Sequence, residues 1–560
     1  MTHEAPHLIS FARSLMRCSN MKVFFCGVFI LCFSLNGCGQ PTKKVSLSDS
    51  TNRDADQTVT GNFSSQSALV FDSIEISHFF AKYPNIKSYE NDVRSFYRKR
   101  NFSFAWFEKG LLIEQAGNLS SRILNLENDG IYKKLFYKEA LDSLMYSVNV
   151  PSEIRKPDII LELLLTSEYF VYTKLAWEGM SQDVSKSNKW YLPRKTVDYN
   201  KYLDSLLESP ANAEAVKEPV YRQYDLLRSH LRKYRELEAS GDWAPIVNIK
   251  NSKIGDSSLV ISQIKKRLFQ FGDFKGDIMN HVFDPGLSSA LINFQQRNGL
   301  ISDGYLNKET ITAINVPLKN RIKQILVNME RSRWLPVKLE RDYLAVNIPE
   351  FKLHVYRADS LLWSCNAVVG QTVHPTTLFY GEIKYVVFSP YWNIPPGILR
   401  NEIIPGMRKS SSYLARHNME ITGYRGGLPV VRQKPGPSNA LGLVKFLFPN
   451  SYNIYLHDTP SKSLFNETSR AFSHGCIRIE EPAKLAAFLL KDAKEWDAEK
   501  ISKAMHAGKE RYVTLSNKVP VFISYFTAFI DRDNRLNFRR DIYNLDERLA
   551  SMIISGEGLY

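Results

Sequence analysis

Tyr455-Leu456-His457-Asp458-Thr459-Pro460 and Ser473-His474-Gly475-Cys476-Ile477-Arg478 stand close together near the end of this 560-residue chain. The two stretches place one cysteine beside two histidines, a glycine and an arginine. Acyl transfer by a cysteine needs a base for the thiol, backbone amides that can approach a developing oxyanion, and a cation that orients an anionic substrate. The sequence therefore indicates that Cys476 is a nucleophile with its supporting groups nearby.

The spacing of the two histidines predicts how each of them reaches Cys476. His457 lies 19 residues before the cysteine, which is enough for two adjacent strands and the loop that joins them. We therefore expect His457 on a strand next to that of Cys476. His474 lies two residues before the cysteine, and residues two apart on an extended segment point to the same face. We expect His474 to share a side with Cys476, and Gly475 to face away.

At these motifs the chain resembles the YkuD-type catalytic domain of L,D-transpeptidases. The resemblance extends upstream through residues 433–442, Gln-Lys-Pro-Gly-Pro-Ser-Asn-Ala-Leu-Gly, and through Val369-Gly370, Thr376 and Trp392-Asn393-Ile394-Pro395. Asp458 agrees with the large, multidomain members found in diderm bacteria, because short members usually carry glycine at this place. The chain is similar to that large branch over roughly residues 70–550.

The resemblance implies a reaction and a role for each site residue. Cys476 would attack the carbonyl that precedes the terminal D-Ala of a tetrapeptide stem, and the amine of a second stem would resolve the thioester to give a 3→3 cross-link. His457 is then the base, the backbone N–H groups of Gly475 and Cys476 form the oxyanion hole, and His474 positions the substrate or the hole. The residues expected to bind substrate are Arg478, Tyr455, Ser473, Trp392 and Asn393.

Other functions use the same residues. With water in place of the amine the enzyme is an L,D-carboxypeptidase, and with an amino group on a protein it is an anchoring transferase. A wall-binding lipoprotein with a dead catalytic domain is the non-enzymatic alternative, which the intact Cys476, His457 and Gly475 disfavour. Acyl transfer through a cysteinyl thioester needs no cofactor, so we expect none.

The N-terminal segment has the pattern of an export signal. Lys22 is followed by a mainly apolar stretch at 23–35 and then by Leu35-Asn36-Gly37-Cys38, which resembles a bacterial lipobox. A spanning helix needs about 20 apolar residues, so this stretch is short for a span. We expect residues 1–37 to be removed, Cys38 to be lipidated, and the protein to face the periplasm from the inner or outer membrane. An uncleaved signal anchor is the alternative.

Cysteine use agrees with export. Of six cysteines, three lie in the expected signal and Cys38 would be lipidated, which leaves Cys365 and Cys476. Two isolated cysteines supply neither a disulfide framework nor a metal cluster, so we expect no metal site. Cys365 has no base or cation beside it and is expected to be a small buried residue.

The remaining sequence predicts a tether and two N-terminal domains. Residues 38–66 are polar and read as a flexible tether. Residues 67–249 are mostly helical, because the apolar run that begins at 159–165 is too long for one strand, and this region resembles the scaffold domain of the large branch. We expect its aromatic residues to be core: Phe96, Tyr97, Trp106, Trp177 and Trp190.

Residues 250–316 form a separate small unit. Apolar residues recur at helical spacing up to Gly272 and again from Leu287 to Phe294. The unit resembles the type 1 peptidoglycan-binding domain, which implies three helices, and residues 317–339 follow as a connecting helix.

Residues 340–560 read as a mostly-β catalytic domain. Strands are expected at 343–348, 353–356, 385–388, 520–525 and 541–543. An insertion at about 396–436 is rich in Gly, Pro and Arg and corresponds, by the resemblance, to a mobile cap. The predicted fold class is therefore multidomain α+β.

The formal charge of +15 suits an anionic partner. Basic residues are scattered among acids and no nucleic-acid-binding motif appears, so we expect no nucleic acid. The expected partners are peptidoglycan stem peptides, as donor and acceptor, and a membrane through the lipid anchor, with the protein a monomer.

Overall fold

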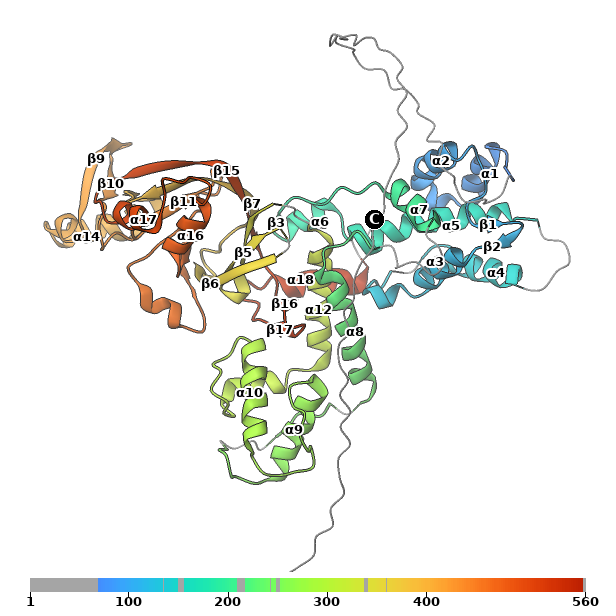
Figure 1. The fold of residues 1–560 in the computed structure, drawn as a ribbon, viewed down its shortest axis with the longest axis horizontal. Coiled ribbons are helices and arrows are strands. Elements are labelled where there is room, and N and C mark those ends of the chain that lie inside the picture. Colours follow the sequence, from blue (N-terminus) through green and yellow to red (C-terminus); the bar gives the residue numbers. More distant parts are fainter. Residues whose placement is uncertain are drawn as a thin grey trace, which may run out of the picture. The chain divides into compact units, whose positions relative to one another are not determined.

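A computed structural model describes residues 69–133, 135–149, 156–208, 217–241, 243–247, 252–336, 341–358 and 360–556 (Figure 1). The predicted signal segment, Cys38 and the predicted tether lie outside the described residues. Within the described part of the chain, no helix has both the length and the apolar character needed to cross a bilayer.

The N-terminal part is mostly helical, as predicted. Its most apolar helix, α5 (Ile159–Tyr172), begins after Asp158, whose carboxylate accepts hydrogen bonds from the N–H groups of Ile160 and Leu161. The five predicted core aromatics are each 2% exposed or less, which confirms that prediction. The other elements are α1 (Ile74–Lys82), α2 (Glu90–Lys99), β1 (Phe107–Glu108), β2 (Leu111–Leu112), α3 (Glu114–Leu124), α4 (Lys138–Asn149), α6 (Gln182–Ser187), β3 (Trp190–Tyr191), α7 (Tyr199–Glu208) and α8 (Gln223–Ala239).

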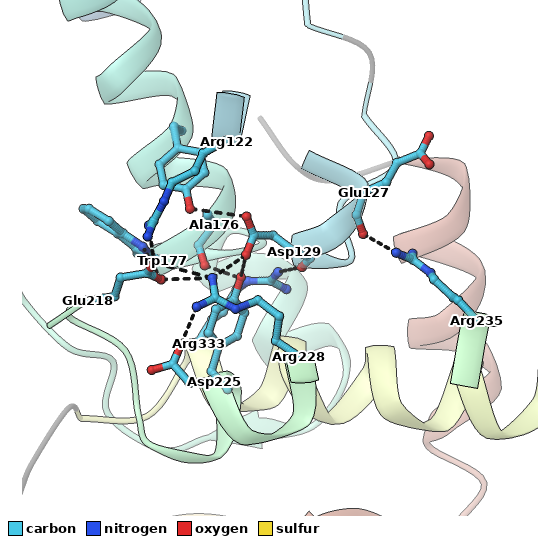
Figure 2. A network of polar contacts seen from close by, with 12 residues as sticks. Arg122, Glu127, Asp129, Ala176, Trp177, Glu218, Asp225, Arg228, Arg235 and Arg333 are labelled. Carbon is cyan, nitrogen blue, oxygen red and sulfur yellow. Dashed lines mark hydrogen bonds and ion pairs between the residues drawn. The ribbon is translucent and has the colours of Figure 1, made fainter. Parts of the chain in front are cut away.

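A polar network joins this helical part to the connecting helix α12 (Leu318–Arg333) (Figure 2). The carboxylate of Asp129 accepts a hydrogen bond from Arg228 of α8 at 2.8 Å. Arg333 of α12 donates to the backbone carbonyls of Asp129 and Ala176 and pairs with Glu330 at 2.6 Å. The bonds from Arg333 to the two carbonyls cross from α12 to the scaffold and hold the two together, while Glu330 compensates the buried charge of Arg333.

The small unit folds as three helices with a core of its own, as predicted. α9 (Leu259–Phe271) ends at Gly272, whose φ of +91° is in the left-handed region that glycine adopts readily. α10 (Pro285–Arg297) and α11 (Lys308–Ile314) begin at Asp284 and Asn307, whose side-chain oxygens accept backbone N–H groups of the first turn. The core includes Ile261, Ile264, Leu268, Leu287, Leu291 and Phe294.

The main sheet of the C-terminal part has the strand order β11-β12-β14-β6-β5-β4-β15-β7-β3. β11 also pairs with β7, which closes the path into a ring, and β3 of the scaffold adds to the edge of β7. The strands predicted at 343–348, 353–356, 385–388 and 520–525 are confirmed. Strand bounds are β4 (Tyr343–Asn347), β5 (Lys352–Arg357), β6 (Ser360–Gly370), β7 (Leu378–Phe388), β11 (Val444–Leu447), β12 (Leu456–His457), β13 (Ala471–Ser473), β14 (Ile477–Ile479) and β15 (Arg511–Ser524).

The strand predicted at 541–543 is wrong, because this segment is a turn. The Asp541 carboxylate accepts hydrogen bonds from the N–H groups of Leu545 and Asp546 at the start of α18 (Asp546–Ser555), which bends the chain. A two-stranded sheet precedes it, made by β16 (Ala528–Ile530) and β17 (Leu536–Phe538). The remaining helices of this part are α16 (Pro482–Leu489) and α17 (Ala498–Met505).

The predicted insertion, residues 396–436, is called the cap below. Together with β8 (Trp392–Asn393) it forms a three-stranded sheet in the order β8-β10-β9, from β9 (Met419–Arg425) and β10 (Leu428–Gln433). Short helices lie between β8 and β9: α13 (Pro396–Ile398), η5 (Leu399–Ile403), α14 (Ile404–Lys409) and α15 (Tyr413–Arg416). Leu399, Ile403 and Val431 form a small core separate from that of the main sheet.

Candidate active site

Two neighbouring strands bring the predicted chemistry together. β12 pairs with β14 in parallel, with Leu456 opposite Ile477 and His457 opposite Arg478. Leu456 and Ile477 are both 0% exposed and belong to the core of the sheet. Side chains alternate along a strand, so His457 and Arg478 lie together on the other face. The expectation that His457 arrives from a neighbouring strand is confirmed.

Tyr455 and Cys476 extend this pairing by one position. The Ile477 N–H donates to the Tyr455 carbonyl at 3.1 Å, so the residue before each paired strand is also aligned. The chain between the strands is not a hairpin: it passes through η6 (Lys462–Asn466) and β13, as parallel neighbours require. The structure thus groups four of the predicted site residues beside one another: Tyr455, His457, Cys476 and Arg478.

His457 is a buried, neutral imidazole. Its Nδ1 lies in hydrogen-bond contact with the Asp458 carbonyl. A carbonyl can only accept, so Nδ1 carries the proton and Nε2 keeps its lone pair. Burial, and then the charge of Arg478, lower the pKa of His457 to about 3. The imidazole is therefore a proton acceptor at neutral pH, and a negative charge on Cys476 would favour its protonated form.

Cys476 carries a neutral thiol in this arrangement. Its Sγ donates to the Asn453 carbonyl at 3.5 Å. Burial raises the pKa of Cys476, and this effect outweighs the N–H and hydroxyl of Tyr455 and the charge of Arg478, which lower it. Burial, followed by the neighbouring Cys476, raises the pKa of the Tyr455 hydroxyl, which therefore stays protonated and able to donate.

The segment around the nucleophile is a tight turn, not an extended strand. Residues 474–476 form a bend between β13 and β14, and Gly475 has a φ of +113°, which favours glycine. The extended geometry from which we expected His474 and Cys476 to share a side, with Gly475 turned away, is therefore wrong. Ser473 closes the turn, because its hydroxyl donates to the Cys476 carbonyl and accepts from the Gly475 N–H at 3.1 Å.

These contacts correct two predicted roles. Ser473 is 2% exposed and its hydroxyl is bonded within the turn, so it braces the nucleophile instead of binding substrate. The Gly475 N–H already donates to Ser473 and is not free to serve an oxyanion. The Cys476 N–H has no hydrogen-bond partner in the part of the chain that the structure describes and is available for that role.

Thr376, from a distant segment, holds the Gly475 carbonyl, and Tyr543 in turn holds Thr376. Thr376 Oγ1 donates to it at 2.8 Å and accepts from the Gly370 N–H at 2.9 Å. The Tyr543 hydroxyl donates to the Gly370 carbonyl at 2.7 Å and accepts from the Thr376 N–H at 3.1 Å. Sequence reasoning used Thr376 only as part of a resemblance and missed Tyr543, because neither residue lies near the motifs in sequence.

His474 lies at the border between the nucleophile turn and the cap. Its side chain is 47% exposed, with Nε2 3.6 Å from Glu402 of the cap. Its ring stacks on that of His374 with 5.2 Å between centroids. Among the described residues no hydrogen bond joins His474 to Cys476. His374 and Glu402 are further site neighbours that the sequence did not reveal.

The predicted substrate residues differ in their positions. Arg478 is half-buried, burial lowers its pKa, and its Nε has no partner among the residues described. Trp392 is half-buried, and its side chain hydrogen-bonds the Tyr455 hydroxyl. This bond lowers the pKa of Tyr455, but burial raises that pKa by more. Asn393, next to it on β8, is exposed and pairs with Arg432 of β10.

Asp458 supports the site from behind His457. Its carboxylate accepts from the Leu443 N–H at 2.8 Å and pairs with Lys462 at 2.6 Å. Gly442 has a φ of +63°, and a Cβ there would overlap Asp458. The buried carboxylate therefore fixes the backbone whose carbonyl holds the His457 ring.

Cys365 is unlike Cys476. It lies on β6, is 5% exposed, and burial raises its pKa to about 11, so it stays a thiol. The prediction that it is a buried residue is confirmed. Within the described ranges, no group of three or more His, Cys, Asp or Glu side chains could hold a metal ion.

Comparison with known families matches three separate parts of the chain. Residues 341–509 match YkuD, described as "L,D-transpeptidase catalytic domain". Residues 91–231 match a family described as "Scaffold domain", and residues 258–314 match one described as "Putative peptidoglycan binding domain". The three matches fall on the main sheet with its cap, on the helical part and on the three-helix unit.

Individual proteins resemble parts of the chain. A protein of Haemophilus influenzae named "Putative L,D-transpeptidase" is 32% identical over 286 residues, which cover 47% of this chain and 56% of that protein. The chain thus spans little more than half the length of this curated relative.

The solved L,D-transpeptidase from Stackebrandtia nassauensis is 13% identical with a TM-score of 0.21, covering 50% of this chain and 97% of that one. The enzyme from Mycobacterium smegmatis is 13% identical with a TM-score of 0.19, covering 33% and 58%. The chain is therefore a multidomain α+β protein whose separate parts match the L,D-transpeptidase catalytic domain, the scaffold domain and the peptidoglycan-binding domain.

Proposed function

We propose that the protein is a peptidoglycan L,D-transpeptidase that forms 3→3 cross-links through a thioester on Cys476. The observation that carries the proposal is the alignment of β12 with β14, which sets the thiol of Cys476 beside Tyr455 and the neutral imidazole of His457 beside Arg478. The match of residues 341–509 to the YkuD catalytic domain supports it.

In the first half-reaction the thiol attacks the carbonyl that precedes the terminal D-Ala of a tetrapeptide stem. Because the pKa of Cys476 is raised and that of His457 is lowered, the pair rests in its neutral form. The thiol proton therefore passes to His457 Nε2 as the C–S bond forms. The C–N bond to D-Ala then breaks, and the same proton goes to the departing amine.

The oxyanion needs donors other than the Gly475 N–H. The candidates are the Cys476 N–H, which has no hydrogen-bond partner among the described residues, and the protonated Tyr455 hydroxyl, which lies beside the sulfur that forms the new bond. Each oxyanion donor contributes about 3 kcal/mol to the stability of the transition state. Ser473 and Thr376 act indirectly, by holding the turn that presents these groups.

In the second half-reaction the side-chain amine of another stem attacks the thioester, gives the amide and restores the thiol. Arg478 is a half-buried cation with an unbonded Nε and orients a stem carboxylate. Water as acceptor makes the protein an L,D-carboxypeptidase, and a protein amine makes it an anchoring transferase. No contact among the described residues favours either of these acceptors over the stem amine.

We also propose that the protein is an exported lipoprotein. The stretch Leu35-Asn36-Gly37-Cys38 supports lipidation of Cys38, and the polar residues 39–66 supply a tether. The catalytic part would then act in the periplasm, where peptidoglycan lies.

The experiment incubates the purified protein with disaccharide-tetrapeptide fragments and separates the products by mass. We expect 3→3 dimers together with one D-Ala for each dimer. Tripeptide fragments with D-Ala but no dimers would identify a carboxypeptidase. Cys476→Ala should abolish both products, whereas Cys365→Ala, the matched loss of a thiol, should keep them. Dimers formed by Cys476→Ala would contradict the proposal.

A further inference from the structure

A serine, a histidine and a glutamate lie in hydrogen-bond contact on the main sheet, and none of them belongs to the Cys476 site. Ser364 Oγ is 2.7 Å from His354 Nδ1, and His354 Nε2 is 2.9 Å from Glu350 Oε2. His354 lies on β5, and Ser364 lies directly opposite it on β6. A nucleophile beside a base that a third group orients is the arrangement of serine hydrolases, which is recognised by geometry and not by order along the chain.

The carboxylate of this group fixes the proton of the imidazole. Burial raises the pKa of Glu350, but the charge and hydrogen bond of His354 and the charge of Arg539 outweigh it and lower this pKa to about 2. Glu350 is therefore ionised and can only accept, so Nε2 of His354 carries a proton. In the neutral ring Nδ1 then keeps its lone pair, which faces the Ser364 hydroxyl. Asn347 also donates to Glu350, at 3.3 Å, and helps to hold the carboxylate in place.

The three side chains differ in their access to solvent. Ser364 is exposed, whereas the side chains of His354 and Glu350 are 16% and 8% exposed. The hydroxyl can therefore meet a substrate from solution, while the groups that would activate it are shielded from water.

The backbone of Ser364 is open on the side of β6 that faces away from β5. The Asn366 N–H donates to Glu480 Oε2 at 3.0 Å, and the Asn366 carbonyl accepts from the Glu480 N–H at 3.1 Å, so both groups of Asn366 point away from β5. These directions repeat every two residues along an antiparallel strand, so the N–H of Ser364 points the same way. β14 pairs only with Ala367 and Val368, and among the described residues the Ser364 N–H has no acceptor. This N–H is therefore available to an oxyanion that forms at Ser364.

An apolar cavity of about 170 Å³ lies beside the base. Its wall contains Glu350 and His354 together with Tyr356 of β5 and Leu361 of β6. Leu361 lies opposite Tyr356 as Ser364 lies opposite His354, so these four side chains project from one face of the sheet. A cavity of about 150 Å³ admits benzene, so this one has room for an acyl group of about six carbon atoms. The aromatic walls are Tyr343, Phe522, Phe526 and Phe529.

We propose that Ser364, His354 and Glu350 form a second catalytic site, which hydrolyses esters of small apolar acyl groups. Ser364 Oγ attacks the ester carbonyl as its proton passes to His354 Nδ1, and the Ser364 N–H donates to the oxyanion. The C–O bond to the alcohol then breaks, and the alcohol leaves with that proton. Water attacks the acyl-serine with His354 again as base, which releases the carboxylic acid and restores the hydroxyl. Glu350 is a positioning residue, because it acts through His354.

The first experiment measures hydrolysis of p-nitrophenyl butyrate by the full chain with Cys476→Ala, which removes the other nucleophile. Ser364→Ala should lower kcat/KM at least tenfold, because the attacking oxygen is gone. Ser360→Ala removes an exposed hydroxyl from the same strand and should change kcat/KM less than twofold. Both serines are exposed, so neither variant is expected to unfold. Equal rates in the parent and in Ser364→Ala would overturn the proposal.

The length of the acyl group tests the role of the cavity. The same chain is given the p-nitrophenyl esters of acetate, butyrate and decanoate, and spontaneous hydrolysis is subtracted. We expect kcat/KM for butyrate to exceed both others at least fivefold, because acetate leaves the cavity largely empty and decanoate is too long for it. Equal values for the three esters would show that the cavity does not receive the acyl group.

A thiol in place of the hydroxyl tests the base without any turnover. In the Cys476→Ala chain, Ser364→Cys should react with iodoacetamide at pH 7 at least tenfold faster than Ser360→Cys, because a neighbouring base raises the thiolate fraction. Adding His354→Gln should remove this difference. If His354 and Glu350 serve only to stabilise the sheet, His354→Gln will lower the melting temperature while the two thiols react at equal rates, and that result would overturn the proposal.

The inference is independent of the proposed function, because the two sites share no residue. Loss of ester hydrolysis in Ser364→Ala and loss of D-Ala release in Cys476→Ala are separate outcomes. Ester hydrolysis that disappears in the Cys476→Ala chain would assign it to the cysteine and reject the second site.

Discussion

Replacing Glu168 by glutamine should stabilise the scaffold at alkaline pH. Glu168 lies on α5, is 1% exposed, and neither of its carboxylate oxygens has a hydrogen-bond partner among the described residues. Burial raises its pKa from 4.5 to about 7. Glu162 on the same helix also has a pKa of about 7, raised by burial, but it accepts hydrogen bonds from the Tyr97 hydroxyl at 2.7 Å and the Trp106 N–H at 3.1 Å.

The magnitude follows from the difference between the two pKa values of Glu168. Between pH 4.5 and 7 the folded protein holds a proton that the unfolded chain has released, so the free energy of unfolding falls as pH rises through this window. A difference of about 2.5 in pKa, at about 1.36 kcal/mol for each pKa unit, gives a penalty of about 3 kcal/mol above pH 7. Glu168→Gln removes the charge. It should therefore recover most of this penalty in the free energy of unfolding at pH 8, and little of it at pH 4.5.

The assay is urea denaturation at pH 4.5 and pH 8, with hydrogen exchange of the α5 amides as the local readout. Glu162→Gln is the matched control. It replaces a hydrogen-bonded carboxylate and should lose about 1–3 kcal/mol at pH 4.5, because an amide cannot accept the same set of donors. The pKa of Glu162 is also raised to about 7, so this loss should be smaller at pH 8, where the variant has no buried charge to ionise. The reasoning fails if Glu168→Gln does not raise the free energy of unfolding at pH 8, or raises it equally at pH 4.5. Either result would show that the carboxyl does not ionise in the folded protein without a partner.

Three further results are expected. Thr376→Val leaves the Gly475 carbonyl without its donor, so kcat for D-Ala release should fall about tenfold or more with little change in KM, and an unchanged kcat would show that the turn needs no such support. Arg478→Gln removes a charge that lowers the pKa of His457, so the acid limb of the kcat/KM profile should move to higher pH; an unmoved limb would argue against His457 as the base. Cys38→Ala should shift the protein from the membrane to the soluble envelope fraction, because a lipid anchor requires that sulfur, and continued membrane retention would favour an uncleaved signal anchor.

The parts of the fold that depend on local pattern could be predicted from the sequence. The apolar spacing from Leu287 to Phe294 and the glycine at 272 predicted α10 and the end of α9 correctly. The residue types around Cys476 indicated a nucleophile, and the distance to His457 indicated a neighbouring strand. These signals are local because a helix, a strand or a helix end is decided by a few consecutive residues.

The hydrogen bonds that shape the site could not be predicted in this way. On an extended strand, side chains alternate between the two faces, and residues 474–476 were expected to follow that rule. In the structure the Ser473 hydroxyl accepts from the Gly475 N–H and donates to the Cys476 carbonyl, which folds the segment into a turn. Thr376 reaches the same turn from another part of the fold, and Tyr543 supports Thr376 from a third. Such contacts depend on how distant segments pack, which residue types and spacing do not record. The strand predicted at 541–543 failed for a similar reason, since the Asp541 carboxylate bonds the start of α18.

The central claim, that Cys476 is an activated nucleophile because of its neighbours, is tested most directly by covalent labelling. A carbapenem presents a strained amide carbonyl in place of that of the stem and should acylate Cys476 to a stable thioester. Intact-mass analysis should show one adduct, peptide mapping should place it on Cys476, and the His457→Ala variant should react more slowly. Cys365 should stay unlabelled, because it lies 5% exposed in the core of the sheet, out of reach of the reagent, and burial raises its pKa to about 11, whereas Cys476 is half-buried and can pass its proton to His457. Equal labelling of both cysteines, or an unchanged rate in His457→Ala, would contradict the account.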